Sequence, residues 1–519
     1  MTKLKTVNYQ CALTVLFAAL VFCFWYFCYP QALCYQEQNQ LFLFTADYLQ
    51  RDLSVAGGLA DYLGEFIVQF YYVPWAGALW LAMLFAAMQG TACFVMKTYT
   101  STGKLTWLGY AGSFLLPLFI IWVMGDIDVL LSFPIAITLS LLAADCVNKA
   151  NCRCGRTLLI AELFIIPVLY WTTGGEATWL YVVLRLAFSV RNKKQMIWNA
   201  ALVVYFLAVE LTAYQTLLRQ YPLKSVMLGI NYYRIPEQLP GISGGYDSDL
   251  YALLKLNEQV RHGKWNDIIR DAEKHQVKDA YASNSVNLAL AKTRQLADRM
   301  FTFYQSGEDA LLSPHKNNNM TNYPTMEAFW HLGMINSSLR YASDLQESIL
   351  NGRKSGRLTQ RMAQCYIVNG SDKAAHKMLD ILKNTLFYRQ WALETEKKVG
   401  NKTLISQDPE MGQAQRMRFK NDFLYNYEEK EKMLGLLFVN NPDNKMALDY
   451  FMGQLLLNGN IKDFMQYMGW VQNFGGYTAM PTGYQDAVRC IQSHGNAPGS
   501  AYGEYVKKMM NQQKEGGDQ

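Results

Sequence analysis

Three carboxylates near the start of the chain have the types and spacing needed for chemistry. Asp126 and Asp128 form an Asp-x-Asp pair in "GDIDVL", and Glu37 stands in "YQEQNQ". Oxygen ligands of this kind hold Mg²⁺ or Mn²⁺, and such a cation neutralises the charge that develops on a leaving phosphate. One of the carboxylates can instead take a proton from a reacting hydroxyl group. The three residues predict a catalytic site, with a divalent cation as a possible cofactor.

The same residues also have a purely structural interpretation. Asp126 or Asp128 can serve as the N-cap of a helix that begins near residue 129, because aspartate accepts hydrogen bonds from the first free N–H groups. Glu37 can stand in the first turn of a helix, where the helix dipole favours a negative charge. The sequence alone leaves both interpretations open.

Apolar segments surround these carboxylates and predict a membrane domain over residues 1–220. A hydrocarbon core about 30 Å thick needs roughly 20 apolar residues of helix. The sixth predicted span is short and contains Arg185. The predicted spans are 7–29, 74–96, 105–124, 129–145, 157–172, 177–190 and 196–218.

The positive charges orient the predicted spans. If the N-terminus is cytoplasmic, Arg51 is the only basic residue in an outer loop before residue 219. This asymmetry is typical of the positive-inside rule, and it places the three carboxylates and everything after residue 218 outside, in the periplasm of a Gram-negative cell. The inner segments hold Lys3, Lys5, Lys97, Lys104, Lys149, Arg153, Arg156, Arg191, Lys193 and Lys194.

The first outer loop, 30–73, is the longest. Its apolar residues recur at helical spacing on both sides of "VAGG", so we expect two amphipathic helices in the membrane interface, with Glu37 at the start of the first. Gln38 and Glu176 are further candidates for substrate binding, and Glu176 can alternatively cap a helix. A phosphate also needs cations. The nearest on the outer side are Arg51, Arg219, Lys224 and Arg234.

Ionisable residues inside the predicted spans are costly and therefore informative. Glu162 and Arg185 fall at a similar depth, which predicts an ion pair between helices. Glu210 lies further out, where it can line a donor groove or make a polar contact in the interior.

The region after residue 220 has the composition of a soluble protein. A linker is predicted over 221–248, an exported helical domain over 249–510 and a disordered tail over 511–519. Helix–Gly–helix patterns recur, as in "MALDYFMGQLLLNGNIKDFMQYMGWV". Further helix pairs are expected, with 283–303 against 325–348 and 356–368 against 371–398. These pairs resemble tetratricopeptide repeats, which stack into an α-solenoid.

Composition excludes several classes of function. A net charge of +6 over 519 residues provides no basic stripe for nucleic acid. Phosphate-binding loops, dinucleotide fingerprints and hydrolase motifs are absent. Cys365 and Cys490 are either buried free thiols or a disulfide pair.

The first 220 residues resemble membrane glycosyltransferases of the GT-C type, including oligosaccharyltransferases. The resemblance rests on Glu37 after the first span, the Asp126/Asp128 motif in the next outer loop, and the seven-span topology. It implies an all-α membrane bundle and transfer of a sugar from a polyprenyl-phosphate-type donor to a periplasmic protein or glycan. Oligosaccharyltransferases have further spans before their soluble domain, and this chain does not.

The whole chain also resembles uncharacterised multi-pass inner-membrane proteins of Bacteroidetes. Two functions follow from the sequence. One is a GT-C-like transferase in the bacterial inner membrane. The other is a non-catalytic anchor that presents a tetratricopeptide-like domain to periplasmic partners.

Overall fold

A computed structural model describes the chain except for residues 1, 100–104, 190–192, 229–246, 315–318, 420–426, 494–496 and 517–519. For 2–8, 98–99, 105–106, 151–159, 189, 193–195, 319, 321, 427 and 512–516 only the backbone is described. Lys104, Arg191 and Arg234, and most of the predicted linker 221–248, lie outside the described residues.

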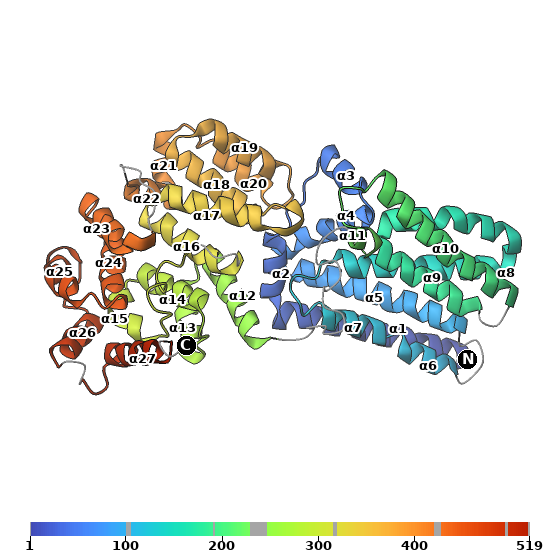
Figure 1. Ribbon diagram of the computed structural model, residues 1–519, viewed down its shortest axis with the longest axis horizontal. Coiled ribbons are helices and arrows are strands. Elements are labelled where there is room, and N and C mark those ends of the chain that lie inside the picture. Colours follow the sequence, from blue (N-terminus) through green and yellow to red (C-terminus); the bar gives the residue numbers. More distant parts are fainter. Residues whose placement is uncertain are drawn as a thin grey trace. The chain divides into compact units, whose positions relative to one another are not determined.

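The described residues form helices and no strand, so the predicted all-α class is confirmed. The chain divides into two compact units (Figure 1). Unit 1 comprises Met1–Asp247 with Asn384–Phe387, and unit 2 comprises Ser248–Lys383 with Tyr388–Gln519.

Unit 1 contains the helices of the predicted membrane domain. Their bounds are α1 Thr2–Cys23, η1 Phe24–Cys28, α2 Pro30–Gln38, α3 Ala46–Leu53, α4 Gly58–Val68, η2 Gln69–Tyr72, α5 Pro74–Tyr99, α6 Leu105–Gly112, α7 Leu115–Val123, α8 Ser132–Thr173, α9 Gly175–Ser189, α10 Lys193–Thr216 and α11 Leu223–Leu228.

Four helical segments of the described chain are long and apolar enough to cross a membrane. They are Tyr9–Cys28, Pro74–Lys97, Ser132–Ala150 and Met196–Thr216. Two shorter apolar helices are Trp107–Val123 and Ile160–Thr173. The segment predicted as the sixth span forms α9, which has 15 residues.

Helix α8 cannot be straight. A straight helix of its 42 residues would be about 63 Å long. Both of its ends nevertheless contact the region of α3 and α4, since a Cβ added to Gly64 would lie 2.9 Å from the Ser132 nitrogen. At the other end, the Gly57 N–H donates to the Trp171 carbonyl oxygen at 3.0 Å. The halves of α8 therefore run antiparallel, as expected for two successive predicted spans.

The two amphipathic helices predicted around "VAGG" are α3 and α4. Gly57 has φ 84°, a left-handed conformation that glycine adopts without a steric penalty, and α4 begins at the next residue. Helices α8, α9 and α10 pack around a shared apolar core (Figure 1). Its fully buried aromatic side chains are Tyr170, Tyr181 and Phe206.

Unit 2 consists of shorter helices. Their bounds are α12 Ser248–Arg261, α13 Trp265–Lys274, α14 Ala280–Lys292, α15 Leu296–Arg299, η3 Met300–Thr302, α16 Asn319–Leu332, α17 Ile335–Ser348, η4 Leu350–Gly352, α18 Gly356–Asn369, α19 Asp372–Lys383, α20 Arg389–Glu396, α21 Lys402–Gln407, α22 Pro409–Met417, η5 Tyr427–Glu429, α23 Lys430–Asn440, α24 Lys445–Leu457, α25 Ile461–Phe474, α26 Thr482–Gln492 and α27 Ala501–Gly516.

Consecutive helices of unit 2 pack in pairs, such as α16 with α17 and α24 with α25. The predicted helix–Gly–helix pattern is confirmed at Gly459. This residue has φ 68° and lies in the turn between α24 and α25. The helix expected over 356–368 is confirmed as α18, whereas the single helices expected over 283–303, 325–348 and 371–398 are wrong. Gly333, with φ 81°, separates α16 from α17, and the segment 371–398 forms α19 and α20.

Two further expectations concern the end of unit 2 and its cysteines. Helix α27 continues through Gly516, so the predicted tail 511–519 includes helical residues. Cys365 and Cys490 are buried free thiols rather than a disulfide pair.

Candidate functional site

The two loops that carry the predicted carboxylates meet in unit 1. Gln36 lies in α2, and its side-chain nitrogen donates to the backbone oxygens of Ile127 at 3.2 Å and Val129 at 3.4 Å. These bonds join residues more than 90 positions apart in the chain. Gln36 is buried, so water does not compete freely for them. The first outer loop therefore holds the Asp126–Asp128 loop at a defined place.

The two aspartates of this loop have different environments. The Asp126 side chain accepts a hydrogen bond from the Asp128 N–H at 3.0 Å and so closes a local turn. The Asp128 residue is exposed, yet the surrounding chain still desolvates its carboxylate. This desolvation, together with the charge of Asp126, raises the pKa of Asp128 to about 6. Asp128 is therefore a base that is mostly ionised at neutral pH and reachable from solvent.

Neither aspartate caps the following helix. Helix α8 begins at Ser132, and its N-cap residue Leu131 makes no side-chain cap hydrogen bond. The capping interpretation of Asp126 and Asp128 is therefore wrong. Asp126 instead shapes the loop that Gln36 holds.

Glu37 stands at the end of α2 and not at the beginning of a helix, contrary to the sequence expectation. The reason is that Pro30 starts α2 directly after the first apolar segment, which leaves Glu37 as its penultimate residue. A negative charge is disfavoured at a helix C-terminus, so the dipole does not explain Glu37. The side chains of Glu37 and Gln38 are buried, next to the residue that binds the aspartate loop.

The predicted metal site is not formed. Among the described residues, no three His, Cys, Asp or Glu side chains lie where they can share a metal ion. Glu37 is buried, Asp128 is exposed and Asp126 is turned into its own loop. The donor set of Glu37, Asp126 and Asp128 does not fit a divalent cation, and we assign no step to one.

A second group of acidic residues lies on α3 and α4. Asp52, Asp61 and Glu65 are buried, and the Tyr48 hydroxyl donates to Glu65. Burial and the charge of Glu65 raise the pKa of Asp52 to about 6, against the opposing effect of Arg51. Sequence reasoning did not select these residues. The signal was the four-residue spacing of Tyr48 with Asp52 and of Asp61 with Glu65, which places each pair on one helix face.

The described phosphate-binding candidates lie on three segments of unit 1: helix α3, the turn after α10, and helix α11. Arg51 forms an ion pair with Asp52 at 2.9 Å and lies over the Tyr48 ring, with its side chain 53% exposed. Arg219 is exposed and donates to the Gln215 carbonyl oxygen. Lys224 is exposed on α11.

Glu176 and Glu210 occupy neighbouring parts of α9 and α10. Glu176 lies in the first turn of α9, where the helix dipole favours a carboxylate. Glu210 is fully buried and accepts a hydrogen bond from the Trp179 ring nitrogen at 3.1 Å. The polar-contact interpretation of Glu210 is therefore confirmed.

The predicted ion pair inside the helical bundle is also confirmed. Arg185 of α9 and Glu162 of α8 are joined at 2.6 Å, and both side chains are at most 1% exposed. Asn148 and Tyr181 bond to the same pair. Hydrogen bonds to both partners lower the cost of burying these charges.

Comparison with known proteins identifies a family. The family described as "Family of unknown function (DUF6057)" matches residues 5–514, which is nearly the whole chain. The chain belongs to this family. No curated protein and no solved structure matches the chain. The matched residues include nearly all of both units.

Proposed function

We propose that the protein is a GT-C-like membrane glycosyltransferase. It transfers a sugar or glycan from a polyprenyl-phosphate-type donor to a protein or glycan acceptor at the periplasmic face of a bacterial inner membrane. The observation that carries the proposal is the Gln36 contact, which joins α2, with the buried Glu37, to the Asp126–Asp128 loop.

The proposal includes a seven-span topology with a cytoplasmic N-terminus, for which four helical segments have the necessary length and apolar composition. The reversal within α8 would supply two crossings from one long helix. Helix α9 is only about 22 Å long, and Arg185 would be costly in lipid, but its pairing with Glu162 removes much of that cost. With seven crossings, the concentration of basic residues on one side keeps the acidic loops outside.

The chemistry is a substitution at the anomeric carbon of the sugar. The acceptor hydroxyl oxygen forms the new bond, and the bond from the anomeric carbon to the carrier phosphate breaks with its electron pair remaining on the phosphate. Asp128 accepts the hydroxyl proton, for which a pKa of about 6 is well suited. Glu37 is buried at the end of α2 and acts through its negative charge, which favours the positive charge that develops on a sugar bound beside the Asp126–Asp128 loop.

The binding roles follow from exposure. Exposed Arg51 and Arg219 are available to a phosphate that arrives from the membrane surface. Gln38, in contrast, is fully buried at the end of α2. In unit 2, the paired helices support a tetratricopeptide-like solenoid whose inner surface receives the acceptor.

The test compares Asp128→Asn with Asp47→Asn in cells that lack the native gene. Asp47 is an exposed carboxylate in the first turn of α3, so it controls for loss of one outer charge. Asp128→Asn should lower the amount of the transferred glycan about 100-fold or more, measured by mass spectrometry of envelope glycans at equal membrane abundance. Asp47→Asn should leave the glycan unchanged.

A positioning variant sharpens the test. Gln36→Ala removes both bonds to the aspartate loop and should lower transfer about 10- to 100-fold through misplacement of Asp128. Glu37→Gln keeps the shape of the side chain and removes its charge. If Asp128→Asn, Glu37→Gln and their combination all preserve normal glycans at normal abundance, the enzyme proposal is wrong.

The alternative function is a non-catalytic anchor that presents unit 2 to periplasmic partners. One observation favours it: unit 2 consists of paired helices, which can stack into a surface for protein partners. Under this alternative, a strain whose protein lacks unit 2 would behave like a strain that lacks the gene. A strain with Asp128→Asn would behave like wild type.

A further inference from the structure

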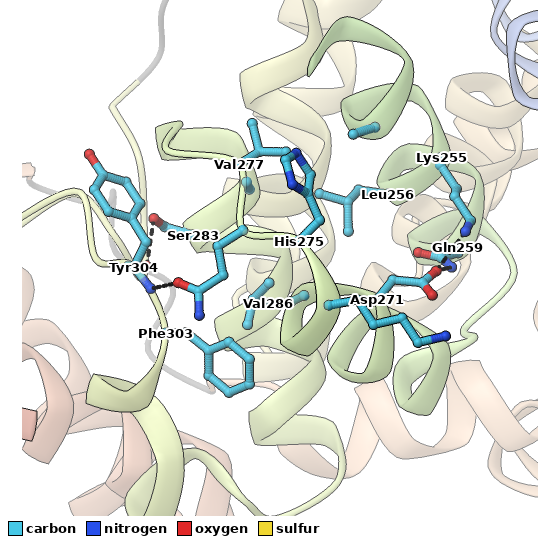
Figure 2. A pocket seen from close by; sticks show the side chains of 15 residues that line it. Lys255, Leu256, Gln259, Asp271, His275, Val277, Ser283, Val286, Phe303 and Tyr304 are labelled. Atoms are coloured by element: carbon cyan, nitrogen blue, oxygen red, sulfur yellow. Dashed lines mark hydrogen bonds and ion pairs between the residues drawn. The ribbon is translucent and has the colours of Figure 1, made fainter. Parts of the chain in front are cut away.

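Unit 2 contains a pocket that the proposed function does not use. It lies between α12, α13 and α14 and has a volume of about 250 Å³ (Figure 2). An engineered apolar cavity of about 150 Å³ admits benzene. By the same measure, this pocket has room for an apolar group of roughly ten non-hydrogen atoms.

The wall of the pocket is mainly apolar. Figure 2 shows Leu256 and Val286 between the Asp271 cluster on one side and Tyr304 on the other. Apolar side chains from several segments complete the lining: Ala252, Ala272, Val277, Ala282 and Phe303. Burial of an apolar group here removes its surface from water, mostly against apolar parts of the wall.

The polar groups of the wall are mostly committed to the protein itself. Asp271 accepts hydrogen bonds from Lys255 at 2.9 Å and Gln259 at 2.7 Å. The Gln276 side-chain oxygen accepts from the Tyr304 N–H at 2.9 Å, and the Ser283 hydroxyl donates to the Tyr304 carbonyl oxygen at 3.1 Å. These bonds fix the wall, so the pocket is formed before any ligand enters.

The rim carries both acidic and basic side chains. Asp271 pairs with Lys255 at 2.9 Å, and Asp249 lies 3.7 Å from the His275 ring. Lys274 also lines the pocket and is exposed, and within the described part of the chain no ion pair or hydrogen bond engages its ammonium group.

Further cations stand beside the pocket. Lys508 lies over the Tyr304 ring at 4.1 Å from its centre. Burial, and to a smaller extent the charge of Lys278, lower the pKa of Lys508, so Lys278 lies near enough for its charge to act on Lys508.

From this arrangement we infer that the pocket binds a small amphipathic carboxylate. The apolar group of the ligand fills the space around Leu256, Val286 and Phe303, and its carboxylate pairs with Lys274 at the rim. A cationic amphiphile of the same shape meets repulsion there, and a neutral one lacks the ion pair. The pocket is therefore selective by charge as well as by size.

The experiment measures binding of three water-soluble probes to the full chain in lipid nanodiscs. 4-Phenylbutyrate, 4-phenylbutanol and 4-phenylbutylammonium share one apolar group and differ in charge. Calorimetric titration, corrected with empty nanodiscs, should show saturable binding of the carboxylate, at least 5-fold tighter than the alcohol and at least 10-fold tighter than the ammonium compound.

Two variants test the assignment. Lys274→Glu should weaken carboxylate binding at least 10-fold and leave the alcohol unchanged, whereas Lys377→Glu, an exposed lysine of α19 away from the pocket, should change neither. Ala252→Trp fills the pocket from its half-exposed wall and should abolish binding of both.

The inference fails if the wild-type chain shows no saturable carboxylate binding. It also fails if the ammonium compound binds equally well, or if Lys274→Glu and Lys377→Glu have the same effect. Membrane partition alone would appear as equal signals from loaded and empty nanodiscs. That result would also contradict binding of the carboxylate in the pocket. None of these outcomes depends on glycosyl transfer.

Discussion

At the residue scale, the acidic side chains of the outer loops divide by environment rather than by sequence context. Asp126 closes a turn, Asp128 is exposed, and Glu37 is buried at the end of α2. Asp52 differs from these three residues, because its side chain is 9% exposed and lies beside other acidic side chains. Each carboxylate therefore has its own response to substitution.

Asp52 should make the stability of the protein depend on pH. Its pKa is raised from 3.8 to about 6 in the folded chain, so the folded state holds more protons than the unfolded state between these values. The stability that Asp52 contributes is complete below pH 4 and is lost as pH rises through 6. A shift of about two units corresponds to roughly 3 kcal/mol at most.

Asp52→Asn removes this dependence because asparagine is neutral at every pH. The melting temperature of the variant relative to wild type should rise between pH 4.5 and pH 7.5 by a few degrees, measured by thermal denaturation in detergent. Asp47→Asn is the control, since Asp47 is exposed on the same helix. A difference that stays constant with pH would contradict the raised pKa.

At the element scale, close contact between helices places the outer loops. Helix α4 packs against the start of α8 at Gly64, where an added Cβ would stand 2.9 Å from the Ser132 nitrogen and 3.2 Å from its Cα atom. Since these are backbone atoms, no side-chain rotation relieves the overlap. Gly64 therefore allows α4 and α8 to approach, and the same helix α8 follows directly after the aspartate loop.

Gly64→Ala should destabilise the protein by about 1–3 kcal/mol, because α4 and α8 must separate. The matched control is Gly90→Ala in α5, where an added Cβ meets nothing within 4 Å. That variant should be neutral or more stable by up to about 1 kcal/mol, since alanine is the better helix former. Thermal denaturation of both variants measures the contrast, and equal effects would argue against the close α4–α8 contact.

At the scale of the whole molecule, membrane topology decides which face carries the chemistry. Four described helical segments satisfy length and composition for a span, and α9 is too short to do so by these criteria. If α9 does not cross, everything after it changes sides. The Arg185–Glu162 pair favours a crossing, because it lets α9 carry a paired charge within the bundle.

Reporter fusions test the topology. Fusions that end after residue 126 and after residue 222 should show alkaline phosphatase activity, and fusions after residues 150 and 193 should show cytoplasmic fluorescent-protein signal. The physical reason is the excess of basic residues at the second pair of positions. Phosphatase activity after residue 193 would mean that α9 does not cross, and it would place unit 2 in the cytoplasm.

The all-α class, the apolar segments, the amphipathic helices around Gly57 and the Glu162–Arg185 pair were predictable from the sequence. Each depends on local periodicity, on glycine at a turn, or on the high cost of a lone charge in lipid. Periodicity and turn glycines act within a few residues, and an unpaired charge in lipid is so costly that a partner is expected. The order of residues is therefore enough to reveal these features.

The tertiary structure decided where each carboxylate lies and what surrounds it. Local spacing placed Glu37 at the start of a helix and grouped it with Asp126 and Asp128 around a cation, whereas Pro30 moved it to the end of α2 and the loops separated the three environments. The Gln36 contact and the pocket of unit 2 each join segments from different helices. Such contacts depend on how helices pack in three dimensions, and no local pattern encodes that packing.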